Sequence, residues 1–144
     1  MVKTKEEVLK MFGDGFDCSQ IVLSSVSDKL GISREEALKI TACFGGGMWH
    51  GETCGCVVGA LIALGIKYGN CKENDNEKKE KLLELKNKFE ENFCKRNKSC
   101  ICKEILGYNL SNPEEMKKIQ EEKLLETRCP LVVLSACEIL DEML

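Results

Sequence analysis

Apolar residues recur three and four positions apart through most of the chain, whereas the strict alternation typical of strands is nearly absent. The pattern therefore predicts helices. The first is expected to begin at Thr4, with Glu7 as its capping-box partner, and to end at Gly13. A second is expected over 17–31, capped by Asp17 with Gln20, and a third from Ser33 to near residue 43.

The most apolar run, Val57 to Ile66, is expected to form a central helix that Thr53 opens and that continues to about Tyr68. A glycine-rich loop, GGGMWHG, precedes it. Gly55, Gly59 and Ala63 form a stripe of small residues along this helix, which indicates that another helix packs closely within the same subunit. The alternative is that this stripe forms the contact between two copies of the chain in a homodimer.

The second half of the chain begins with a highly charged stretch over residues 72–98. One narrow apolar stripe runs along it, which predicts a long helix exposed to solvent; the stripe consists of Leu82, Leu85, Phe89 and Phe93. A short helix is expected after Ser99, another over 113–125 opened by Pro113, and a last one opened by Pro130. No linker or repeat divides the chain, so residues 1–144 are predicted to form a single-domain, all-α bundle of about seven helices.

The composition excludes several classes of function. The net charge is −3, which argues against nucleic acid as a partner. The longest apolar run is shorter than the roughly 18–20 residues that span a membrane, so no membrane association is expected. The amino-terminal segment lacks the apolar core of a secretory signal. The ten cysteines are therefore expected to be reduced in a cytoplasmic protein and to serve in metal binding or redox chemistry.

Four cysteines fall at predicted helix amino termini, namely Cys18, Cys54, Cys102 and Cys129. Unpaired backbone N–H groups and the positive end of the helix dipole stabilise a negative charge there. We therefore expect these thiols to have depressed pKa values and to act as metal ligands or as nucleophiles.

The other cysteines have different surroundings. Cys43 and Cys71 fall near helix carboxyl ends, and Cys94 and Cys137 are interpreted as small hydrophobic residues inside helices. Cys56 and Cys100 complete two Cys-x-Cys pairs with Cys54 and Cys102, which makes a four-cysteine zinc site an alternative. Positions i and i+2 of a helix point about 200° apart, so a pair converges only where its turn is non-helical.

The single histidine, His50, lies in the glycine loop and is expected to be exposed rather than a ligand. Because the chain has no second histidine, a cysteine–histidine hydrolase is poorly supported. The loop is not followed by Lys-Ser or Lys-Thr, so it is not a phosphate loop.

The motifs FDCSQIVL, GETCGCVVGALIALGIKYG, SCICKEILGYNLS and CPLVVLSACEILDEML follow one another in the chain. In this order they resemble the C_GCAxxG_C_C family, whose members are small, helical, cysteine-rich and expected to be redox-active. The four cysteines that name the family correspond to Cys18, Cys54, Cys102 and Cys129. Where the family motif usually reads Cys-Gly-Ala, this chain has Cys56, an additional candidate ligand.

A related domain is fused to the split-Soret type of cytochrome, where it resembles an iron–sulfur unit. The resemblance therefore implies that the four cysteines hold an iron–sulfur cluster, with Gly45, Gly46, Gly47 and Gly55 approaching it closely, and that the protein passes electrons to a redox partner protein. The first alternative is a thiol–disulfide oxidoreductase that uses the same cysteines without metal. The second is a protein that binds zinc or copper(I) through its thiolates.

Overall fold

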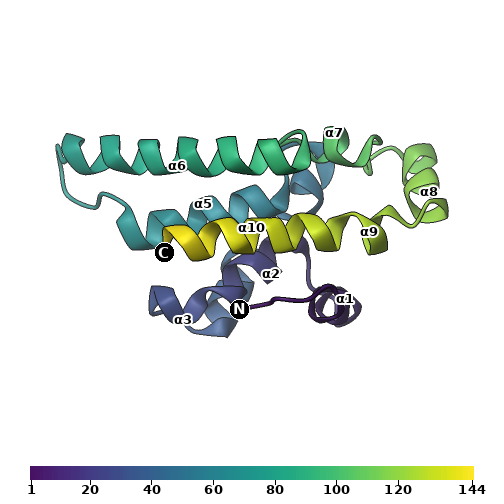
Figure 1. Ribbon diagram of the computed structural model, residues 1–144, viewed down its shortest axis with the longest axis horizontal. Coiled ribbons are helices and arrows are strands. Elements are labelled where there is room, and N and C mark those ends of the chain that lie inside the picture. Colours follow the sequence, from purple (N-terminus) through teal and green to yellow (C-terminus); the bar gives the residue numbers. More distant parts are fainter.

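A computed structural model describes residues 1–144 and consists of helices joined by short loops (Figure 1). The α-helices are α1 (Lys5–Gly13), α2 (Cys18–Ser25), α3 (Ser27–Leu30), α4 (Arg34–Ile40), α5 (Gly55–Tyr68), α6 (Asn76–Asn97), α7 (Cys102–Leu106), α8 (Pro113–Glu121), α9 (Leu124–Thr127) and α10 (Cys129–Met143), and a wide turn, η1 (Gly47–Gly51), lies before α5. The all-α fold class is confirmed. None of the helices is both long enough and apolar enough to cross a membrane.

The structure has ten α-helices where about seven were expected. The sequence patterns described above mark eight helical segments, and two of these are each divided in the structure. The helix expected over 17–31 is interrupted at Val26, whose φ of −113° and ψ of 7° are not helical. The helix expected over 113–125 ends at Glu121, since Lys123 adopts a left-handed conformation with φ of 54°. The capping box predicted at the start of α1 is present, and Ser33 caps α4, where the third helix was expected to begin.

Three long helices form the centre of the bundle. α5 and α10 lie beside each other, α6 lies along both, and α2 packs against α5 and α10 (Figure 1). The apolar stripe of α6 faces this core: Phe89 and Phe93 are fully buried, and their rings stack with centroids 5.9 Å apart. Most other residues of α6 are exposed, as its charge pattern predicts.

The small residues of α5 face α2. A Cβ atom added at Gly59 would lie 2.8 Å from the backbone oxygen of Ser19, a distance that leaves no room for a larger side chain. The stripe therefore serves packing within the chain, as expected.

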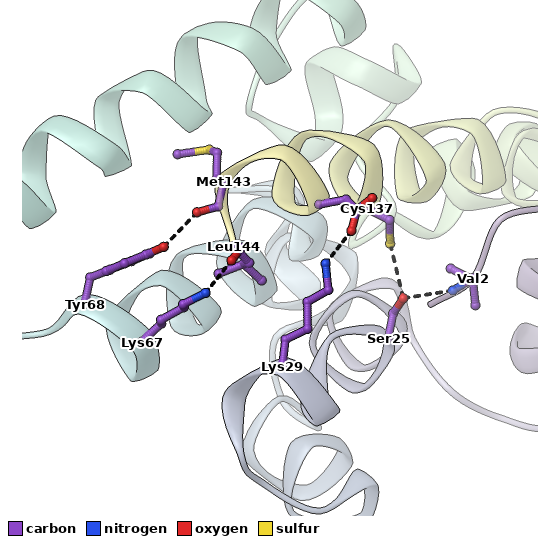
Figure 2. A network of polar contacts seen from close by, with 9 residues as sticks. Val2, Ser25, Lys29, Lys67, Tyr68, Cys137, Met143 and Leu144 are labelled. Atoms are coloured by element: carbon purple, nitrogen blue, oxygen red, sulfur yellow. Dashed lines mark hydrogen bonds and ion pairs between the residues drawn. The ribbon is translucent and has the colours of Figure 1, made fainter.

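The carboxyl end of α10 is fixed by polar contacts with three other segments (Figure 2). Tyr68 Oη donates to the backbone oxygen of Met143 at 2.9 Å, and Lys29 pairs with Asp141 at 2.5 Å. The hydroxyl of Ser25 accepts a hydrogen bond from the thiol of Cys137, which is buried in the core as predicted. These contacts hold α10 in place, and its other end carries Cys129.

Candidate functional site

Five cysteine side chains line one cavity of about 510 Å³, which lies where the main core meets a smaller apolar cluster formed around α7 and α8. They come from four segments that are distant in the sequence: Cys18, Cys54 with Cys56, Cys102 and Cys129. The structure thus brings together the four cysteines predicted from the sequence and adds the one that departs from the usual family pattern.

Three of these cysteines, Cys18, Cys102 and Cys129, are each the first residue of a helix. Cys18 begins α2, where the side-chain oxygen of Gln20 accepts the backbone N–H of Asp17 at 2.9 Å. Cys129 begins α10, and Arg128 is the cap of this helix. The guanidinium of Arg128 donates to the backbone oxygen of Ile105 at 2.9 Å, which ties the start of α10 to α7.

A short antiparallel contact joins the two Cys-x-Cys segments. The backbone N–H of Cys54 donates to the backbone oxygen of Cys100 at 2.8 Å. The backbone N–H of Cys102 donates to the backbone oxygen of Glu52 at 2.6 Å. Thr53 and Ile101 form the isolated bridge between them. This contact places Cys54 and Cys102 at the wall of the same cavity.

Cys54 is itself the cap of α5, one residue later than the predicted Thr53 cap. Its φ of −52° and ψ of 134° are not helical. Because the turn is non-helical at this residue, Cys54 and Cys56 both reach the cavity, which positions i and i+2 of a regular helix would not do.

The glycine loop lies against the cavity in an unusual conformation. Gly46, Gly47, Met48 and Trp49 all have φ between 57° and 62°, in the left-handed region. A Cβ atom at Gly47 would lie 2.5 Å from the backbone nitrogen of Glu52 and 2.8 Å from Cys102 Cβ. Only glycine therefore fits there.

The four glycines that were expected to approach the bound group do not all lie at the cavity. Gly46, Gly47 and Gly55 line the cavity, and a Cβ atom at Gly55 would lie 2.5 Å from Cys18 Sγ. Gly45 is not at the cavity wall; it packs against the side chain of Asp17.

The surroundings of Cys18 favour its thiolate form. The neighbouring thiols of Cys54 and Cys56 and the backbone N–H groups of Gly46 and Ser19 stabilise the charged sulfur, and together they hold the pKa of Cys18 well below its ordinary value. The expectation of a depressed pKa is therefore confirmed at this cysteine.

The expectation is wrong at the other three predicted cysteines. The neighbouring thiol of Cys18 raises the pKa of Cys54, and burial followed by the charge of Cys18 raises the pKa values of Cys102 and Cys129 to about 12. The neighbouring thiols of Cys18 and Cys54, followed by burial, raise the pKa of Cys56. The cost of burying the charged form outweighs the stabilisation that a helix terminus gives to a thiolate. The negative charge of one thiolate also disfavours a second thiolate in the same cavity.

The remaining cysteines and the histidine lie outside the cavity. His50 is exposed, as expected, and so are Cys43 and Cys71. Cys94 is not the simple core residue that was expected, because its Sγ lies 2.6 Å from Cys100 Sγ. Cys100 therefore faces Cys94, and the two Cys-x-Cys pairs do not meet in one four-cysteine site.

Sequence patterns did not identify the apolar wall of the cavity. Leu9, Phe12 and Phe16 come from α1 and the loop after it, and Trp49 comes from η1. The one feature of the sequence that could have indicated this wall was the position of Trp49 within the glycine loop. The contribution of α1 depends on how the helices pack, which no local pattern specifies.

No curated protein and no solved structure gave a significant match to this chain. A protein-family model described as "Putative redox-active protein (C_GCAxxG_C_C)" matches residues 16–143. The matched region includes all five cavity cysteines and the glycine loop. Since the match spans most of its length, the chain belongs to the C_GCAxxG_C_C family.

Proposed function

We propose that this protein is a small electron carrier that holds an iron–sulfur cluster on Cys18, Cys54, Cys102 and Cys129. The observation that carries the proposal is the convergence of cysteines from four separate segments on one largely apolar cavity. The membership of a family described as redox-active agrees with it.

The donor set fits such a group. Five thiols, the ligand type that holds iron–sulfur clusters, line the cavity together with one thioether, Met116, and no histidine lines the wall. No three Cys, His, Asp or Glu side chains are arranged to hold a single metal ion. The thiols are instead distributed around a volume of about 510 Å³, which accommodates a group of several atoms.

The residues of this chain would set the properties of the bound group. A cluster supplies reversible one-electron chemistry, and its potential depends on hydrogen bonds to sulfur and on solvent exposure. The backbone N–H groups of Gly46 and Ser19 already contribute to lowering the pKa of Cys18. Phe12, Phe16 and Trp49 also line the cavity and contribute apolar cover.

Anaerobic expression and purification test the proposal. We expect a brown protein that contains iron and acid-labile sulfide, with both lost at least tenfold in Cys54→Ser and Cys129→Ser. Cys43→Ser and Cys71→Ser are matched controls at exposed cysteines and should retain both. A colourless protein without iron after anaerobic reconstitution would refute the proposal, and zinc or copper in stoichiometric amount in place of iron would favour thiolate binding of those metals.

A specific arrangement of thiols also favours a second candidate, a thiol–disulfide oxidoreductase. Cys18, Cys54 and Cys56 line the same cavity, and the two neighbouring thiols contribute to lowering the pKa of Cys18, so three thiols that could exchange disulfides share one site. This candidate predicts reversible two-electron oxidation of the metal-free protein. Mass spectrometry after alkylation would exclude it if no oxidant-dependent pairing appeared among the five cavity cysteines.

A further inference from the structure

A second pair of cysteines lies outside the cavity, where the end of α6 meets the loop before α7. Cys94 Sγ and Cys100 Sγ are 2.6 Å apart. Non-bonded heavy atoms prefer a separation of roughly 3.5–4 Å, and a disulfide bond measures about 2.05 Å. The two sulfur atoms are therefore closer than ordinary packing allows. We propose that Cys94 and Cys100 form a reversible disulfide, a two-electron redox site distinct from the cavity cysteines.

The chain around the pair is held in the pairing conformation by bonds that do not involve sulfur. α6 ends at Asn97, and Lys98 then reverses the chain with φ of 73°. The hydroxyl of Ser99 accepts the backbone N–H of Ile101 at 3.0 Å. Because the turn between the two cysteines is already ordered, closing the bond costs little additional conformational entropy.

The end of α6 is also anchored to α10. The side-chain amide of Asn97 donates to the backbone oxygen of Phe93 at 3.0 Å and to the hydroxyl of Ser135 at 2.8 Å. Phe93 is fully buried in the core. The backbone that carries Cys94 is therefore fixed, and the position of its sulfur beside Cys100 does not depend on a mobile terminus.

Both cysteines are half-buried, so a dissolved oxidant can reach the pair. Cys100 is outside the cavity wall, and its thiol donates to the backbone oxygen of Glu90 at 3.7 Å. The oxidant we propose is a disulfide, either of a small thiol or of another protein. The pair therefore lies outside the cavity that is lined by five other cysteines.

The exchange balances in two steps. One cysteine of the pair attacks a sulfur atom of the partner disulfide, which gives a mixed disulfide and releases the first partner thiol. The second cysteine then attacks the mixed disulfide at the protein sulfur and releases the second partner thiol. Cys94 and Cys100 lose two electrons and two protons in total, and the two released thiols carry them.

The test uses the full-length protein at defined ratios of reduced to oxidised glutathione, quenched with acid, alkylated and digested with trypsin. Trypsin cleaves after Lys95 and Lys98, so the two cysteines fall on separate peptides, 89–95 and 99–103. Under oxidising ratios we expect these peptides to appear linked by a disulfide, with the loss of two alkylatable thiols from the ten in the chain. The link should disappear when the reducing ratio is restored.

Peptide 99–103 also contains Cys102, which provides a matched pair of variants. The link should persist in Cys102→Ser and be absent in Cys100→Ser. A link that survives in Cys100→Ser would overturn the proposal. So would wild-type protein in which Cys94 and Cys100 stay alkylatable, or carry only glutathione, at a ratio that modifies the exposed Cys43. The wild-type measurement needs no variant to fold, and its result does not depend on whether iron is bound.

Discussion

Cys18 differs from the other cavity cysteines in the number of groups that stabilise its charge. Two neighbouring thiols and two backbone N–H groups lower its pKa. Cys102 and Cys129, which are also at helix starts, have no such groups that offset their burial. A position at a helix terminus is therefore insufficient to lower a thiol pKa, and specific donors at the sulfur atom decide the outcome.

Gly55 is the residue that allows Cys18 to approach α5. Substitution by alanine would place a Cβ atom 2.5 Å from Cys18 Sγ and 2.7 Å from the backbone oxygen of Phe44. We expect Gly55→Ala to lower the free energy of unfolding by about 1–3 kcal/mol, the usual cost of overpacking. Urea denaturation of the reduced protein measures this change.

The matched control for this prediction lies in the same helix. A Cβ atom at Gly65 would meet no atom within 4 Å. Gly65→Ala should therefore raise the free energy of unfolding by about 0.5–1 kcal/mol, because alanine favours the helix. Equal effects of the two substitutions would show that the space beside Cys18 is not limiting.

At the scale of elements, sequence patterns predicted the helices well and the glycine segment poorly. Capping residues and apolar spacing identified the starts of α1 and α4 and the buried face of α6, because these features depend on neighbours three or four positions away. The left-handed run through Met48 and Trp49 had no local signal, since neither residue favours that conformation. The contact between Thr53 and Ile101 was also missed, because it joins segments that are 48 residues apart.

Met48 provides a test of this left-handed segment. It is 48% exposed and has φ of 59°, a conformation that costs a residue with a side chain about 1–2 kcal/mol relative to its preferred one. Glycine avoids this cost but loses about 0.5–1 kcal/mol of chain entropy on folding. We therefore expect Met48→Gly to raise the free energy of unfolding by up to about 1 kcal/mol in urea denaturation.

Met11 is the matched control, since it lies within α1 at a regular helical position. Met11→Gly should lower the free energy of unfolding by at least about 1 kcal/mol, because glycine is unfavourable inside a helix. If Met48→Gly destabilised the protein as much as Met11→Gly does, the segment would not be left-handed in solution.

At the scale of the whole molecule, the cavity exists because two apolar clusters meet without filling the space between them. Cys54 and Cys56 belong to the large cluster, and Cys102 belongs to the small one. The identity of the cavity cysteines was predictable from helix starts and from the family motif. The volume between the clusters and the separate Cys94–Cys100 pair were not, because both depend on how α6, α7 and α10 are placed in three dimensions.

The raised pKa values of the cavity thiols make the stability of the reduced, metal-free protein dependent on pH. In the unfolded chain a cysteine has a pKa of about 8.5. In the folded protein the pKa values of Cys102 and Cys129 are about 12. Above pH ~8.5 the unfolded state therefore binds fewer protons than the folded state, so the free energy of unfolding falls as pH rises toward 12. The lowered pKa of Cys18 has no opposing effect in this window, because its stabilising contribution is already complete above about 8.5.

Each of the two thiols should contribute a slope of up to about 1.4 kcal/mol per pH unit. Anaerobic urea denaturation at several values between pH 7.5 and 10.5 measures the total slope. Serine does not titrate in this range, so Cys129→Ser should have a shallower slope than the wild type, whereas Cys43→Ser, at an exposed cysteine, should have the same slope as the wild type. Indistinguishable slopes in Cys129→Ser and Cys43→Ser would contradict the prediction, and would mean that burial in the cavity does not hold the proton on Cys129.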